Sequence, residues 1–205
     1  MEFSAIVEKR RSIKNYDTSA TLSDAQLEKI FSTTVLSPSS FNLQHWSFVV
    51  TRDPELKKEL QTASWGQQQV ADSSAVVLVC GKLDAHNDVA ELWPGMPDEV
   101  LQKIDGTSQQ IYGGSEQMQR DEAIRGASLA AMSLMYAATD QGIESGPMIG
   151  FDPQAISTIL EIPDNFIPVI MIVLGSGTGD EMPRGYRRPL QEVVKLEKFS
   201  GSGLG

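Results

Sequence analysis

The spacing of apolar residues along the chain predicts five helices and three strands. Helical spacing predicts helices over about residues 2–10, from Ser23 to residue 36, and over 54–63, 121–141 and 153–160. The apolar segments 47–50, 75–80 and 167–174 predict strands, and the unbroken run at 75–80 is typical of a strand buried on both faces. We find no internal repeat and no linker, so one domain over residues 1–205 is expected.

Capping signals support three of the predicted helix starts. Ser23 followed by Gln26 is a capping-box pattern, and Leu22 with Leu27 would form its hydrophobic staple. Asp53-Pro54 and Asp152-Pro153 each place an N-cap residue before a proline at the first helical position.

The segments on either side of residue 120 differ sharply in composition. Residues 83–119 are acidic and polar, and we predict an exposed, variable helical excursion there. Residues 121–141 are small and apolar, which permits close helix packing and predicts a central core helix or one at a subunit interface. From residue 176 onward we predict an extended tail.

The charge distribution bears on what the chain binds. A net charge of -10 argues against general nucleic-acid binding. Four of the 17 Lys and Arg residues lie in the first 14 positions, however, and five lie in the last 22. The two ends could therefore build one local anion site, and solvated terminal charge is the alternative.

Localisation is constrained by apolar run lengths and by cysteine content. The longest aliphatic run, 167–174, is too short to span a bilayer, and no export signal opens the chain. The single Cys80 suits a reducing compartment, so we expect a cytoplasmic protein with no membrane partner. Cys80 lies in an apolar strand pattern, which predicts a buried structural thiol.

Three polar segments carry candidate binding chemistry. Residues 10–14 combine guanidiniums, a hydroxyl and an ammonium group, a set suited to gripping a phosphate. The loop 37–46 (Ser-Pro-Ser-Ser-Phe-Asn-Leu-Gln-His-Trp) and the segment 65–70 (Trp-Gly-Gln-Gln-Gln-Val) offer hydroxyls and carboxamides beside aromatic rings. Such segments can hold a planar, heteroatom-rich ligand, although a plain polar turn remains the alternative for each.

The sequence lacks an obvious amino-acid catalyst. Two histidines and one cysteine make a His/Cys metal cluster improbable, and neither a phosphate-loop motif nor a nucleophile elbow is present. Residues 175–179 resemble a dinucleotide loop, but Asp180 stands where that fingerprint needs its last glycine. If the protein is an enzyme, a bound cofactor is expected to carry the reaction.

Four segments together resemble the nitroreductase family of FMN-dependent NAD(P)H oxidoreductases. They are residues 10–14 near the start, 37–46, the Pro-Met-Ile-Gly-Phe-Asp segment 147–152, and Arg187-Arg188-Pro189-Leu190 in the tail. Their order and spread match the family over nearly the whole chain, and the cyanobacterial-type branch acting on nitroaromatics and quinones is the most similar. The resemblance implies an α+β fold with a mixed, mostly antiparallel sheet flanked by helices, in an intertwined homodimer with FMN at the interface.

The resemblance also implies a set of cofactor-binding residues and no catalytic side chain. The phosphate and ribityl end would be held by Arg10, Arg11, Ser12, Lys14, and Arg187 or Arg188. The flavin ring would be edged by Pro38, Ser39 and Ser40 of the other subunit, by Asn42, by Gln67 and Gln69 on the pyrimidine side, and by backbone N–H groups of Ile149 and Gly150. This chain has Gly66 where relatives often have Asn, and Ile149 where some have Glu.

The predicted reaction takes hydride from NAD(P)H and reduces a nitroaromatic or a quinone by a ping-pong mechanism, with the flavin N5 carrying the chemistry. A non-catalytic flavin-storage protein, or another reductive reaction such as dehalogenation, is the alternative. Phe41, Trp65, Trp93 and Tyr112 are candidate substrate-shaping aromatics, and core packing is the alternative for each.

Overall fold

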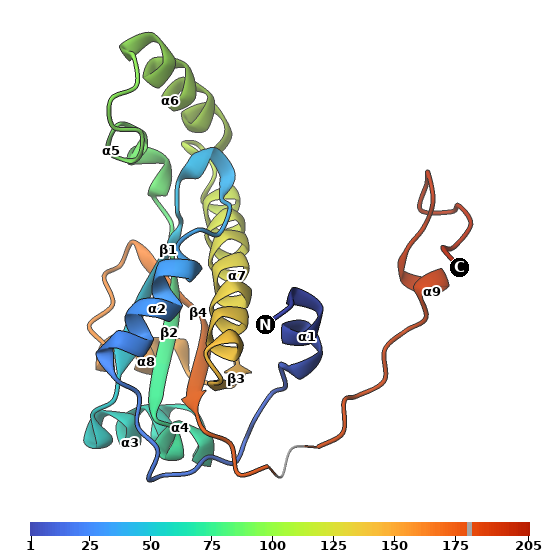
Figure 1. Cartoon of the computed structure of the whole chain (residues 1–205). Helices are drawn as coiled ribbons and strands as arrows, with labels where there is room; N and C mark the ends of the chain where they lie inside the picture. The colour runs from blue at the N-terminus through green and yellow to red at the C-terminus, as the bar shows by residue number, and fades with distance from the viewer. Residues whose placement is uncertain (180–181) are drawn as a thin grey trace.

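The computed structural model describes residues 1–179 and 182–205, and it contains an antiparallel sheet between two helical layers (Figure 1). The strands are β1 (Trp46–Thr51), β2 (Ala75–Lys82), β3 (Glu144–Met148) and β4 (Phe166–Gly175), in the spatial order β1-β2-β4-β3. Asp180 and Glu181, two residues of the predicted tail, lie outside the described residues.

Helices cover both faces of the sheet. One layer holds α2 (Asp24–Thr34) and the long α7 (Glu116–Asp140), and the other holds α3 (Pro54–Ala63), α4 (Gln68–Asp72) and α8 (Pro153–Ile159). The short η1 (Ser40–Asn42) precedes β1. Three elements follow β2: η2 (Ala85–Asn87), α5 (Val89–Leu92) and α6 (Asp98–Tyr112), of which α5 and α6 stand away from the sheet. α1 (Phe3–Lys9) and α9 (Leu190–Val193) belong to the two ends of the chain.

The two central strands explain why both faces are covered. Along β2, Ala75, Val77 and Val79 pack toward α2 and α7, while Val76 and Leu78 pack toward α3, α4 and α8. Successive strand residues point to opposite faces, so a continuous apolar strand leaves apolar surface on both sides. The predicted strand at 75–80 is confirmed as buried on both faces, and Cys80 is a buried thiol whose pKa burial raises to about 11.

The predicted capping signals are confirmed. Ser23 and Gln26 exchange both hydrogen bonds of a capping box, and the Asp53 and Asp152 carboxylates accept from backbone N–H groups in the first turns of α3 and α8. Within the described part of the chain, all strand pairings are antiparallel, and the one parallel contact is a bridge between Ser12 and Ser145. Among the described residues, no helix is both long enough and apolar enough to cross a membrane.

Four of the described elements were not predicted from the sequence: β3, α4, the short η1, and α9, which lies in the predicted extended tail. β3 reads Glu-Ser-Gly-Pro-Met and has no apolar alternation, so only its pairing with β4 identifies it as a strand. α4 has five residues, too few to show helical spacing. The helix predicted over 121–141 begins five residues earlier, at Glu116, because the Ser115 side chain caps it.

The N-terminal segment lies between β3 and the start of the tail. Ile13 N–H donates to the Ser145 carbonyl (3.0 Å), while Asp17 N–H donates to Ser176 (2.8 Å). Gly146 makes this approach possible, because a Cβ at that position would overlap the carbonyl of Ile13. The missing side chain at Gly146 therefore helps bring residues 10–14 to the edge of the sheet.

We expect Gly146→Ala to lower stability by roughly 1–3 kcal/mol, since a methyl group in this contact forces the backbone apart. Thermal unfolding would then occur several degrees lower. Gly106→Ala is the matched control, because no atom lies within 4 Å of its added Cβ and alanine favours the helix. Equal melting temperatures for the two variants would show that the contact at Gly146 is not tight.

Candidate functional site

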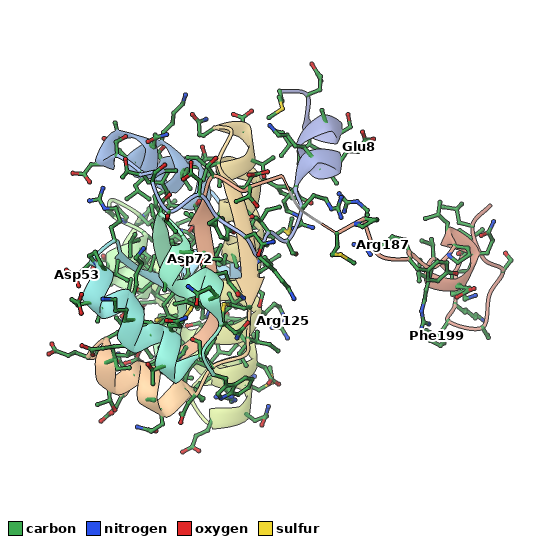
Figure 2. The ribbon with its side chains drawn as sticks, turned by 90° about the horizontal axis from the view of Figure 1, so that it is seen from below. Glu8, Asp53, Asp72, Arg125, Arg187 and Phe199 are labelled. Carbon is green, nitrogen blue, oxygen red and sulfur yellow. The ribbon has the colours of Figure 1, made fainter. Side chains whose placement is uncertain are left out.

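Basic residues from both ends of the chain line one open cavity. Its described lining contains Arg10, Arg11, Ser12, Arg184 and Arg187, together with Met182, Pro183 and Gly185. Arg10 and Arg11 come directly after α1 in the chain. Arg184 and Arg187 approach them from the tail, and Figure 2 shows Arg187 below α1. The cavity therefore presents four guanidiniums and, among the described lining residues, no carboxylate.

The electrostatics of this cavity favour an anion. The pKa of Arg10 is lowered, first by burial and then by the nearby positive charges of Arg184, Arg187 and Arg11. Binding of an anion among these positive charges reduces the electrostatic repulsion between them. Planar guanidinium forks and the Ser12 hydroxyl are donors suited to a phosphate.

Arg184 holds the tail against the first helix. Its Nη2 donates to the carbonyls of Glu8 (2.7 Å) and Arg10 (3.0 Å) at the end of α1. These are carbonyls that a helix leaves without internal partners. The sequence analysis counted Arg184 among the cations near the C-terminus but did not assign it to the site. Its position in that group of cations was the one sequence feature that could have indicated its role.

Two predicted phosphate-binding residues do not line this cavity. Lys14 and Arg188 are both exposed, and neither belongs to its described lining. Arg187 lines it and donates from Nη1 to the carbonyls of Gly185 and Tyr186. Of Arg187 and Arg188, it is therefore Arg187 that lies near Arg10 and Arg11 within one chain.

A chain of side-chain amides forms a second group of predicted residues. Gln67 Nε2 donates to the Gly150 carbonyl (2.6 Å), and Gln69 Nε2 donates to Gln67 Oε1 (2.9 Å). These two hydrogen bonds orient the Gly150 peptide, and the Gln69 Oε1 accepts no hydrogen bond from a described residue. A Cβ at Gly150 would collide with Gln67 and press on the Trp65 ring, so glycine permits the close approach.

Two exposed apolar side chains flank these amides. Trp65 is 74% exposed and Ile149 is 76% exposed. Trp65 also has a positive φ of 57°, which is unusual for a bulky residue. The amide chain, Trp65 and Ile149 together form a surface with polar groups at its centre and apolar groups at its rim.

Strand β3 connects the cationic cavity with the amide chain. Ser145, near its start, is bridged to Ser12, and its last residue, Met148, lies two residues before Gly150. At a rise of about 3.3 Å per residue, the two groups are separated by roughly 15 Å along the strand direction. That arrangement suits an elongated ligand with an anionic end and a planar, heteroatom-rich end.

The loop 37–46 forms a third group, at the other end of the sheet. Trp46, where the loop enters β1, pairs with Gly81 near the end of β2, whereas α4 precedes the start of β2. No hydrogen bond or ion pair among the described residues connects Ser39, Ser40 or Asn42 to the amide chain. A single chain therefore does not bring all predicted ring contacts together.

The predicted substrate-shaping aromatics differ in exposure. Trp65 is exposed, while Phe41 and Trp93 are half-buried and linked by a hydrogen bond from the indole N–H to the Phe41 carbonyl (3.0 Å). Tyr112 is only 4% exposed and packs with Leu43 and Ala85. Within one chain, Tyr112 therefore packs in a core, which was the alternative to substrate contact.

His45 is buried beside this loop. Burial lowers its pKa to about 4, with the neighbouring His86 and Arg125 contributing in the same direction, and its Nδ1 has no hydrogen-bond partner. A neutral imidazole enclosed in this way is a packing element rather than a proton donor. Among the described residues, no cluster of three or more His, Cys, Asp or Glu side chains could hold a metal ion.

A separate apolar groove lies between α1, α2 and α7. Phe3, Ile6, Leu36, Pro38 and Tyr136 line it together with several polar residues, and Leu36 is largely exposed. The tail carries further exposed apolar side chains, including Phe199 at its far end (Figure 2). Neither surface is covered within one chain.

Comparison with known proteins gives consistent matches. The model described as "Nitroreductase family" matches residues 7–176. MhqN of Bacillus subtilis, named as an NAD(P)H nitroreductase, is 39% identical over 202 residues, which cover 95% of this chain and 98% of that protein. Protein DrgA of Synechocystis is 36% identical over 87% of this chain and 85% of its own length.

Solved structures agree with these matches. The nitroreductase ydfN from Bacillus subtilis superposes with a TM-score of 0.91 at 38% identity, covering 95% of this chain and 98% of that one. A nitroreductase in complex with FMN from Exiguobacterium sibiricum superposes with a TM-score of 0.88 at 29% identity, covering 96% and 98%. These neighbours confirm the predicted α+β fold with its mostly antiparallel sheet.

Proposed function

The chain belongs to the nitroreductase family, and we propose that it works as an FMN-dependent NAD(P)H oxidoreductase whose electron acceptor is a nitroaromatic compound or a quinone. The observation that carries the proposal is the cavity in which Arg10, Arg11, Arg184 and Arg187 converge beside Ser12. A cavity of this composition fits a phosphate monoester, which carries close to two negative charges.

The second part of the fit concerns the ring. FMN has a planar ring edged with carbonyl oxygens and nitrogens, which need donors and acceptors in one plane. Gln69 would offer its carboxamide to the pyrimidine side, and Gln67 would hold Gln69 and the Gly150 peptide in place. The backbone N–H groups of Ile149 and Gly150 would then donate toward N5 and the neighbouring oxygen.

The role of the protein is binding, orientation and electrostatics. FMN would supply the two-electron hydride-transfer chemistry when bound. The backbone N–H donors of Ile149 and Gly150 would stabilise the negative charge that develops on the ring. His45 stays neutral at physiological pH and is enclosed, so solvent is the proposed source of protons.

We further propose that the active form is a homodimer, in which Pro38, Ser39 and Ser40 of one subunit meet the Gln67 and Gln69 amides of its partner. The separation of these groups within one chain supports this arrangement, because a complete ring site needs both. The uncovered apolar groove and the apolar tail support it as well, since exposed patches of this kind are typical of interfaces. A cytoplasmic location suits the chemistry of an NAD(P)H-dependent reductase.

The reaction is tested on purified protein reconstituted with FMN. We expect a yellow protein that bleaches anaerobically with NADPH or NADH and recolours with a quinone or nitroaromatic, with parallel lines in double-reciprocal initial-rate plots. Parallel lines follow if the nicotinamide product leaves before the acceptor occupies the same face. Intersecting lines would contradict this order, and a flavin that no nicotinamide reduces would favour a storage protein.

The phosphate assignment is tested by comparing the two tail arginines. We expect Arg187→Ala to weaken FMN binding by roughly tenfold to a hundredfold, because it removes a charge-assisted hydrogen bond. Riboflavin, which lacks the phosphate, should lose little affinity. Arg188→Ala is the matched control, and quenching of flavin fluorescence measures each affinity. A larger loss for Arg188→Ala than for Arg187→Ala would reverse the assignment.

The proposed dimer is tested by sedimentation equilibrium of the holoprotein, with an expected mass of twice that of one chain. Leu36→Glu should shift the equilibrium toward the monomer and lower FMN affinity at the same time, because a charge placed in the groove opposes its burial. Val100→Glu, at another exposed apolar position on α6, is the control. A wild-type holoprotein with the mass of one chain would refute the dimer.

A further inference from the structure

The backbone of the loop that follows Pro38 is held in an unusual conformation. Phe41, Asn42 and Gln44 have φ values of 50°, 55° and 44°, in the left-handed region that non-glycine residues rarely adopt. Such a conformation persists only where surrounding contacts determine it. Within the loop, Gln44 N–H donates to Ser39 Oγ (2.9 Å) and Leu43 N–H to the Ser40 carbonyl (2.9 Å).

The additional contacts come from the excursion between β2 and α7. The Tyr112 hydroxyl, on the last turn of α6, is hydrogen-bonded to Ser40 Oγ (2.7 Å). Trp93 donates to the Phe41 carbonyl (3.0 Å), and Asn42 Nδ2 donates to the Leu92 carbonyl (3.3 Å). Three successive loop residues are thus each fixed by a different residue of the excursion.

The same contact is supported by a small apolar core. Leu43, Ala85, Val89 and Tyr112 are all buried and pack together, with Phe41 and Trp93 against them. The Tyr112 ring also stands edge-on to Phe41, with ring centroids 6.4 Å apart. Burial raises the pKa of Tyr112, so its hydroxyl keeps its proton at neutral pH.

We propose that the excursion is the scaffold of the loop 39–44, and that Tyr112 is a positioning residue which fixes Ser40 for contact with the flavin ring. The inference deepens the proposed function and rests on it for the identity of the ligand. It gives the excursion a role in cofactor affinity and gives Tyr112 a role that acts through Ser40, without contact between Tyr112 and the substrate.

The first test needs no ligand. We expect Tyr112→Phe, which keeps the packed ring and removes only the hydroxyl, to speed amide hydrogen exchange at residues 42–44 of the ligand-free protein. Ser108→Ala is the matched control, because Ser108 is fully buried on the same helix one turn earlier and its hydroxyl bonds within the excursion, to Asp105 and His86. Unchanged exchange in Tyr112→Phe, or equal acceleration in Ser108→Ala, would overturn the proposal.

The second test measures flavin affinity by fluorescence quenching. Tyr112→Phe should weaken FMN and riboflavin by the same factor, about twofold to tenfold, because the lost hydrogen bond acts at the ring and not at the phosphate. Ser108→Ala should change either affinity by less than about twofold. A loss confined to FMN would place the effect at the phosphate and overturn the proposal.

A double-mutant cycle separates positioning from general loosening. If Tyr112 acts through Ser40, the variant carrying both Ser40→Ala and Tyr112→Phe should bind flavin as Ser40→Ala alone does. Multiplying effects would show that the two residues act independently, against the proposal. If the wild-type protein binds no FMN, the proposed function fails together with the flavin part of this inference, whereas the exchange result at residues 42–44 still decides the scaffold.

Discussion

The structure depends on the burial of two central strands on both faces. β2 and β4 are apolar at successive positions, so neither face of the sheet can be left to water. Helices α2 and α7 bury one face and α3, α4 and α8 bury the other. This requirement places α4, with its glutamines, and α7 on opposite sides of one sheet.

The site is built where that sheet has an accessible edge. β3 is short and polar, and the N-terminal segment aligns beside it through the Ser12–Ser145 bridge and the space left by Gly146. The tail then returns along the same segment, and Arg184 anchors it to the end of α1. Backbone contacts of this kind hold the positive charges from both ends of the chain close together. They are needed because the guanidiniums repel one another when no anion is bound.

In the loop 39–44, contacts from the excursion hold an unusual backbone conformation. A left-handed backbone at three non-glycine residues has a conformational cost, which the contacts from Leu92, Trp93 and Tyr112 offset. Under the proposed function, a loop fixed in this way needs less ordering when it binds the flavin. The polar, acidic composition of the excursion gives no local sign of these contacts, because Leu92, Trp93 and Tyr112 make them from separate parts of the excursion.

Local signals in the sequence were sufficient for most of the fold. Capping residues and apolar spacing act within a few positions, so the starts of α2, α3 and α8 and the strands β2 and β4 followed from the residues themselves. β3 did not, because its Gly-Pro sequence has no strand pattern and becomes a strand only by pairing with β4. The four family-like segments likewise predicted, from sequence alone, four of the residues that line the cationic cavity: Arg10, Arg11, Ser12 and Arg187.

Tertiary structure alone decided which of those residues meet. Arg187 rather than Arg188 reaches Arg10, Arg184 joins the site through helix-end carbonyls, and Gln67 bonds to Gly150 across 83 positions of the chain. Tyr112 proved to be a core residue because α6 turns its last residue toward Leu43. These outcomes depend on contacts between segments far apart in sequence, and no periodicity or local propensity encodes such contacts.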